Sequence, residues 1–177
     1  INNNLIYDNT VLGINISENA LITNNTIYDN CAPTGAGIRI RMTGSDDIFF
    51  FNNIIYNNRL NDQDSTYCQV ELIEPMIYFP DFYYCDIQDG VEGFSGVEFE
   101  GEYIQCIDSD PLFIDPENSN FQFLSDSPSI NAGTSDTTGL NLPEFDLAGN
   151  SRIYNDIIDM GCYEWQGTEI IDEEFVP

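Results

Sequence analysis

Short apolar runs bracketed by asparagines recur along the first third of the chain. The same seven-residue pattern occupies residues 3–9, 24–30 and 52–58: an Asn pair, an apolar run ending in Tyr, then Asp or Asn followed by a further Asn. β-Branched and aromatic residues favour strands, whereas Asn tolerates the left-handed backbone that turns require. Each copy therefore predicts one strand between two turns.

The spacing of the three copies predicts a coiled chain. Tyr7, Tyr28 and Tyr56 lie 21 and 28 residues apart, within the range of repeats that stack on one another. Two further strand-like segments precede the second and the third copy, at residues 13–16 and 20–22 and at residues 37–40 and 48–51. Three strands per turn, stacked about 4.8 Å apart, would form three parallel sheets. Residues 67–70, 76–78 and 83–88 fit a further, less regular coil.

These repeats resemble the right-handed parallel β-helix family, in which Asn residues stack into a ladder at one corner; pectate lyases and polygalacturonases share that fold. The resemblance implies an all-β protein whose residues 1–107 form three-strand coils with an Asn-ladder corner. It makes Asn3, Asn24 and Asn52 structural residues. Because the chain begins inside a repeat, we expect further coils before Ile1.

The second half has no helical period and carries turn signals every eight to twelve residues. Its motifs at residues 110–113, 127–133, 146–152 and 159–164 resemble, in this order, the C-terminal end of secreted bacterial β-helix proteins of the choice-of-anchor type, commonly exported by Bacteroidetes-like bacteria. The resemblance implies a secreted, cell-surface protein. We expect residues 108–167 to form an irregular β-rich cap on the helix end, and residues 168–177 an acidic linker. Structural ion pairing is predicted for Arg152 with Asp146, Asp159 and Glu164.

The charge balance limits the partners of the protein. Asp and Glu number 31 against four basic residues, giving a net charge of −27, with no Lys and no His. Such a field repels nucleic acids and anionic membranes, so neither nucleic-acid binding nor membrane insertion is expected. It attracts cations, and Ca²⁺ suits carboxylate oxygens. Asp108, Asp110 and Asp115 are candidate calcium ligands, with capping of local turns as the alternative.

Five cysteines are scattered without a metal-binding spacing: Cys31, Cys68, Cys85, Cys106 and Cys162. Two arrangements remain open. The thiols either stack inside the coil as small apolar side chains, or two of them form a disulfide.

Two groups of residues are candidate surface ligand contacts. Arg39 and Arg41 alternate on one predicted strand and share a face, with Asp46 and Asp47 nearby. In an aromatic segment further along, Tyr78 and Phe82 are candidate platforms for stacking sugars, with burial as the alternative. No catalytic residue is assigned, because general acid–base chemistry has few bases to draw on here.

Three functions remain in competition. The favoured one is a non-catalytic module, a rigid scaffold or adhesin-like wall that contacts polysaccharide or a cell-surface glycan. The second is the C-terminal fragment of a polysaccharide lyase or glycoside hydrolase whose site lies in earlier coils. The third is an element that associates head to tail into filaments or a surface layer.

Overall fold

The computed structural model describes residues 1–41, 47–60 and 67–167. Within these residues the protein is all-β, as predicted, and most strands pair in parallel. The helical segments in the described residues are two short 3₁₀ turns, η1 (Gly90–Gly93) and η2 (Pro116–Asn118). None of the described segments is a helix long and apolar enough to cross a membrane.

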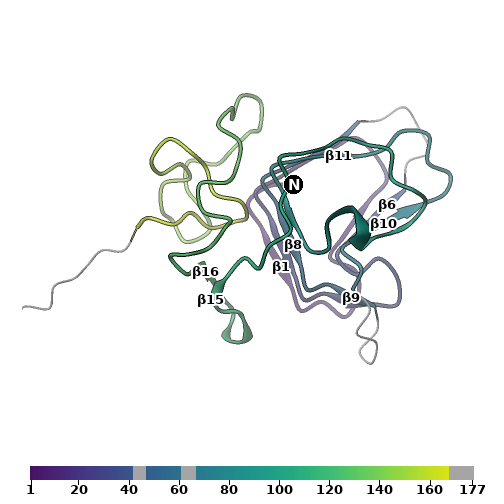
Figure 1. Ribbon diagram of the computed structural model, residues 1–177, viewed down its shortest axis with the longest axis horizontal. Coiled ribbons are helices and arrows are strands. Elements are labelled where there is room, and N and C mark those ends of the chain that lie inside the picture. The colour runs from purple at the N-terminus through teal and green to yellow at the C-terminus, as the bar shows by residue number, and fades with distance from the viewer. Residues whose placement is uncertain (42–46, 61–66, 168–177) are drawn as a thin grey trace, which may run out of the picture.

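Three parallel sheets of four strands each build the first part of the chain (Figure 1). Sheet A contains β3 (Ala20–Thr23), β7 (Ile48–Phe51), β11 (Asp81–Tyr83) and β14 (Tyr103–Ile104). Sheet B contains β1 (Leu5–Tyr7), β4 (Thr26–Tyr28), β8 (Ile54–Tyr56) and β12 (Asp86–Ile87). Sheet C contains β2 (Ile14–Ile16), β6 (Ile38–Arg41), β10 (Val70–Ile73) and β13 (Phe94–Gly96).

The chain visits sheets C, A and B in turn and then returns to sheet C, so each turn adds one strand to every sheet. A short parallel pair, β5 (Cys31–Ala32) with β9 (Arg59–Leu60), follows sheet B in two successive turns. We call residues 1–107 the coiled region and residues 108–167 the C-terminal region. Figure 1 looks along the stack, with the C-terminal region beside it.

Strand register superimposes the copies of the repeat. Tyr7 lies beside Tyr28, and Tyr28 lies beside Tyr56. The strands predicted in the first two full turns occur where the pattern placed them. In the next turn the strands are β10 and β11 rather than residues 67–70 and 76–78. The position of β10 is set by its pairing with β6. Val70 and Leu72 lie beside Ile38 and Ile40, so that apolar side chains stack on apolar ones inside the coil.

The interior of the coil is filled by side chains that stack from turn to turn. Ile27, Ile55 and Ile87 follow one another in register, and each is fully buried. Phe50 and Phe82 are also aligned and buried, with ring centroids 4.4 Å apart and nearly parallel planes. Burial of each such side chain contributes about 1.5–3 kcal/mol.

A ladder of amides runs along the corner between sheets A and B. Asn4 donates to Asn25 Oδ1 at 2.9 Å, and Asn25 donates to Asn53 Oδ1 at 2.9 Å. In the next two turns Cys85 and Cys106 continue the ladder; Cys85 Sγ accepts from the backbone of Asn53, and Cys106 Sγ accepts from the backbone of Cys85. The ladder satisfies polar groups that would otherwise be buried without partners.

A second amide ladder, which the sequence analysis did not identify, follows the other end of the repeat. Asn9 donates to Asn30 Oδ1 at 2.7 Å, and Asn30 donates to Asn58 Oδ1 at 2.8 Å. Asn58 then donates to Gln69 Oε1 at 2.8 Å. The two ladders fix both ends of each sheet B strand against its neighbours.

The cysteines form no disulfide among the described residues. Cys68, Cys85 and Cys162 are buried, and burial raises the pKa of the Cys162 thiol to about 11. Buried thiols of this kind remain protonated and behave as small apolar side chains. Of the two arrangements left open by the sequence, the structure has the stacked thiols at Cys85 and Cys106.

The C-terminal region lies along the side of the coil, whereas the sequence predicts a cap on its end. Its antiparallel hairpin, β15 (Phe113–Asp115) and β16 (Asn120–Phe123), covers the outward tyrosines of sheet B. Phe121 packs edge-on against Tyr7 at 5.0 Å and against Tyr28 at 5.2 Å. The repeat places one tyrosine on this face in each of three turns, and the hairpin packs on the resulting aromatic stripe at Tyr7 and Tyr28, although Tyr7 remains 36% exposed.

The first asparagine of each pair points outward and binds the C-terminal region. Asn3, Asn24 and Asn52 have positive φ angles of 54°, 52° and 56°. Asn24 Nδ2 donates to the carbonyl of Asp159 at 3.0 Å, and Asn52 Oδ1 accepts from the backbone of Thr134 at 2.8 Å. The left-handed residue turns the chain so that its own side chain faces out and the next Asn faces in.

Candidate binding surface

The outer face of sheet C carries the two arginines that the sequence placed on one strand. In β6, Ile38 and Ile40 are fully buried, whereas Arg39 and Arg41 alternate with them and face outward. Register places Arg39 between Asn15 of β2 and Glu71 of β10. Ser95 of β13 follows next in the row, so this face presents a line of polar side chains across four strands.

Arg39 and Glu71 form an ion pair across neighbouring strands, with Nε and Oε2 3.0 Å apart. The side chains are 35% and 19% exposed, so solvent screens the pair and its net contribution to stability is about 0–1 kcal/mol. Within the described residues Arg41 makes no ion pair, and it is exposed. The Arg41 guanidinium is therefore accessible to a ligand, whereas that of Arg39 is held by Glu71.

Two shallow hollows meet on this face. One, of about 350 Å³, is lined by Arg39, Glu71, Ile73, Glu74 and Val97 among others. The other, of about 210 Å³, is lined by Asn15, Ser17, Arg39, Arg41 and Ile73. Arg39 and Ile73 line both hollows, so together they form a continuous depression across sheet C. It combines guanidinium donors, carboxylate acceptors and an aliphatic floor.

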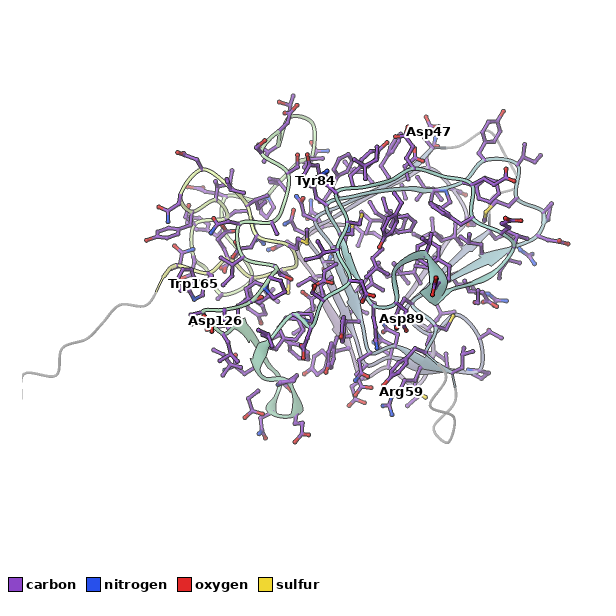
Figure 2. All side chains as sticks on the ribbon, viewed as in Figure 1. Asp47, Arg59, Tyr84, Asp89, Asp126 and Trp165 are labelled. Carbon is purple, nitrogen blue, oxygen red and sulfur yellow. The ribbon has the colours of Figure 1, made fainter. Side chains whose placement is uncertain are left out.

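The acidic residues predicted beside the arginines are not brought onto this face by any described contact. Asp46 lies outside the described residues. Asp47 is exposed just before β7 (Figure 2), and its backbone accepts from Ala20 and donates to Asn19 Oδ1. Glu71, which the sequence analysis missed, supplies the carboxylate instead.

The two candidate aromatic platforms have different environments. Tyr78 is 48% exposed and lies outside the strands, so its ring is accessible. Phe82 is fully buried and contacts Phe50, Phe94, Phe99 and Tyr103. Prediction of Phe82 as a surface contact was therefore wrong. In β11 the side chain of Phe82 points into the coil. The sequence predicts the strand at residues 76–78 instead, and so gives no sign of this inward position.

The three candidate calcium ligands take part in separate local hydrogen bonds. Asp108 accepts from the backbone of Asp89, Asp110 accepts from the backbone of Leu112, and Asp115 accepts from Asn118 Nδ2. The described residues contain no group of three or more metal-ligating side chains. Binding of Ca²⁺ stays a prediction, which calorimetric titration with CaCl₂ tests.

Arg152 lies at the contact between the C-terminal region and the coil. It is 1% exposed; its guanidinium donates to Glu164 Oε2 at 2.8 Å and to Asn3 Oδ1 at 3.1 Å. Of the three carboxylates predicted to pair with Arg152, Glu164 forms the ion pair among the described residues, through one carboxylate oxygen. Its guanidinium also donates to the carbonyls of Gly161 and Tyr163, so Arg152 connects the last loop to Asn3 of the coil.

The carboxylates around Arg152 are held by backbone amides. Asp159 accepts from Asn131 and Trp165, and Asp146 accepts from Ala148, Asn150 and Glu164. Desolvation raises the pKa of Glu164 to about 7 and that of Asp159 to about 6, although the nearby Arg152 opposes both shifts. These residues are enclosed, so the geometry favours a structural role over contact with a ligand.

Comparison of the chain with protein-family models, curated proteins and solved structures gave no match.

Proposed function

We propose that residues 1–107 form a right-handed parallel β-helix of the pectate-lyase-like type. The chain would be the C-terminal part of a secreted, Bacteroidetes-like surface protein of the choice-of-anchor type. Its function would be that of a non-catalytic, rigid wall that contacts polysaccharide through the outer face of sheet C. The observation that carries this proposal is the depression around Arg39 and Arg41.

Rigidity of the wall is supported by the repeated contacts between turns. Two amide ladders and a continuous apolar interior connect successive coils, so neighbouring strands are tied at the corners as well as along their backbones. A stack in which every turn contacts its neighbours forms an extended surface of fixed geometry. Such a surface suits a long, repetitive ligand.

The chemistry of the depression favours a hydroxyl-rich polymer. Arginine supplies hydrogen-bond donors, Glu71 and Glu74 supply acceptors, and Ile73 offers apolar contact to the C–H face of a sugar ring. The net charge of −27 disfavours a polyanion, so we expect neutral polysaccharides to bind better than polyuronates.

A glycan array probed with the wild-type protein and with an Arg39→Ala/Arg41→Ala double variant tests this proposal. We expect the wild type to bind neutral glycans and the double variant to bind at least one of these glycans more weakly. Arg59→Ala is the matched control, because Arg59 is also partly exposed and ion-paired, with Asp29 at 2.5 Å, but lies in β9 outside sheet C. Equal binding by the double variant and the wild type would refute a role for this face.

The enzyme alternative is tested on the same glycans by lyase and hydrolase assays. The chain has no His or Lys, and the described part of the sheet C depression contains Arg and Glu as its titratable side chains. We therefore expect binding without turnover. Cleavage by the wild type that disappears in Arg39→Ala would favour a fragment of a lyase or hydrolase instead.

Head-to-tail association is a second candidate, supported by the edge of sheet C at β13. In the described part of the chain, β13 pairs with β10 and has no partner along its other edge. Unpaired strand edges are templates for another chain. Sedimentation that grows with protein concentration, with fibres in electron micrographs, would support association; a concentration-independent monomer would exclude it.

A further inference from the structure

A second cavity lies in the C-terminal region, separate from the face of sheet C. It has a volume of about 640 Å³ and is formed by the β15–β16 hairpin together with the loops around Asn150 and Trp165. The volume is within the range of small-molecule sites in proteins. Trp165 lies on the side of the molecule away from β6 and β10, as comparison of Figure 2 with Figure 1 shows.

Aromatic and aliphatic side chains make up much of the wall of this cavity. Tyr163 and Trp165 are half-buried in it, whereas Ile114 and Leu124 are each 47% exposed. Phe123 is almost fully buried and forms part of its floor. Half-buried aromatic rings offer apolar area together with a polar tip, a combination that suits an amphipathic ligand.

Amide side chains supply hydrogen-bonding groups in fixed orientations. Asn150 Nδ2 donates to Asp146 Oδ2 at 3.2 Å, and Gln166 Nε2 donates to the carbonyls of Ser151 and Glu164 at 3.3 Å each. These bonds hold the amide nitrogens and leave both amide oxygens as acceptors. Because a carboxylate or a carbonyl only accepts, the orientation of each amide is determined by its partner.

Two further groups are available as donors. Among the described residues, neither the Trp165 indole N–H nor the Gln122 side-chain amide has a hydrogen-bond partner, and Gln122 is exposed. Both residues line the cavity. The cavity thus combines fixed acceptors, available donors and aromatic surface, which are the features that match a sugar with its hydroxyl groups and apolar ring face.

The charges around the cavity select against an acidic ligand. Asp146 and Glu164 lie in its lining, and no Arg or Lys is among the lining residues. The one nearby cation, Arg152, is already paired with Glu164. A carboxylate brought here would face the Asp146 carboxylate without a counter-ion among the lining residues.

We propose that this cavity binds a short neutral oligosaccharide, with Trp165 as the stacking surface and Gln122, Asn150 and Gln166 as hydrogen-bonding partners. The proposal does not rest on the binding surface of sheet C. It gives the C-terminal region a recognition role in addition to its packing against the coil.

The protein offers a direct probe, because Trp165 is its only tryptophan. Fluorescence of the full chain is titrated with manno-, xylo-, cello- and galacto-oligosaccharides, and with oligogalacturonate as the acidic comparison. We expect a saturable change with at least one neutral oligosaccharide and a weaker response to oligogalacturonate. No saturable change with any neutral oligosaccharide, or an equal or stronger response to oligogalacturonate, overturns the proposal.

Substitution separates specific recognition from general effects on the fluorophore. Gln122→Ala removes an exposed side chain and is expected to weaken binding about fivefold, as for loss of one hydrogen bond. Gln105→Ala, at an exposed glutamine of the coil after β14, is the matched control and is expected to bind like the wild type. Equal affinity of the two variants contradicts the assigned contact.

The sheet C variant distinguishes this proposal from the proposed function. Arg39→Ala/Arg41→Ala is expected to retain the full fluorescence response, since the arginines and Trp165 line different cavities. Weaker array binding with a retained fluorescence response is the result expected if both sites exist. Loss of the fluorescence response in that double variant, with an unchanged melting temperature, would show that the cavity is not an independent site.

Discussion

Asp86 provides the most informative perturbation of the fold. It is a fully buried carboxylate in β12, where Oδ1 accepts from the backbone of Ser109 and Oδ2 accepts from Ser129 Oγ. Desolvation raises its pKa from 3.8 to about 7, with Asp108 and Asp110 adding repulsion and the two hydrogen bonds opposing the shift. The substitution Asp86→Asn removes the charge and retains the shape.

The sign of the effect follows from proton binding. A raised pKa means that the folded state holds the proton more tightly than the unfolded state does. The stability contributed by protonated Asp86 is therefore lost as pH rises, and the loss is complete above about pH 7. Between the unfolded and the folded pKa, the free energy of unfolding falls by about 1.4 kcal/mol per pH unit. The full difference is on the order of 4 kcal/mol.

Urea unfolding of the wild type and Asp86→Asn, from about pH 5.5 to about pH 8.5, measures this dependence. The lower limit keeps the protein away from its pI of about 4.1. We expect Asp86→Asn to gain stability relative to the wild type by about 2 kcal/mol between pH 5.5 and pH 7. Asp89→Asn, at a neighbouring exposed carboxylate, is the control. A difference between wild type and Asp86→Asn that does not change with pH refutes the reasoning.

Three further substitutions test the packing. Arg152→Ala leaves a buried carboxylate without its cation and should lower the free energy of unfolding by about 3–5 kcal/mol. The surface variant Arg59→Ala should lower it by about 0–1 kcal/mol, and thermal melts of the two variants measure the difference. Asn53→Ala removes a buried rung of the first ladder and should cost about 1–3 kcal/mol in urea unfolding; a neutral result would show that the ladder is dispensable. Phe82→Ala should cost about 3–5 kcal/mol, whereas Tyr78→Ala should change stability by less than about 0.5 kcal/mol, and equal effects would contradict their assigned burial.

Much of the coiled region could be predicted because the same short pattern of apolar and polar residues recurs in successive turns. The residues flanking Ile27 and Ile55 recur with the same polarity, so strand positions follow from the pattern alone. Which asparagine of a pair faces inward was not predictable in the same way. Asn24 and Asn25 differ in backbone conformation, since Asn24 adopts a positive φ, and that choice depends on the stacked neighbours and on the C-terminal region.

The later coils were harder to place because their residues change while their roles persist. Tyr84 has the left-handed conformation of the first asparagine, and Cys85 takes the ladder position of the second. Tyr84 and Cys85 therefore occupy the positions of the Asn pair that defines the repeat, but neither of them is an asparagine. The contact of Arg39 with Glu71 was missed for the same reason, because it depends on the register of β10.

The lateral position of the C-terminal region depends on contacts between residues more than a hundred positions apart. Phe121 meets Tyr7, and Arg152 meets Asn3. The motif around residue 152 predicted buried ion pairing within the region. Its partner on the coil is a neutral amide, and nothing in the local sequence distinguishes that asparagine from the others. The side-on position could therefore not be predicted from local sequence, because the tyrosines that Phe121 contacts become neighbours only when the sheet B strands stack.

The measurement that tests the proposed function most directly is a calorimetric titration with the neutral glycan that binds best on the array. The wild type, Arg39→Ala/Arg41→Ala and Arg59→Ala are compared, and thermal melts first establish that the three proteins have the same melting temperature. We predict that the double variant binds at least about tenfold more weakly and that Arg59→Ala binds like the wild type. Equal affinities of all three proteins would contradict the assignment of sheet C as the polysaccharide-binding wall.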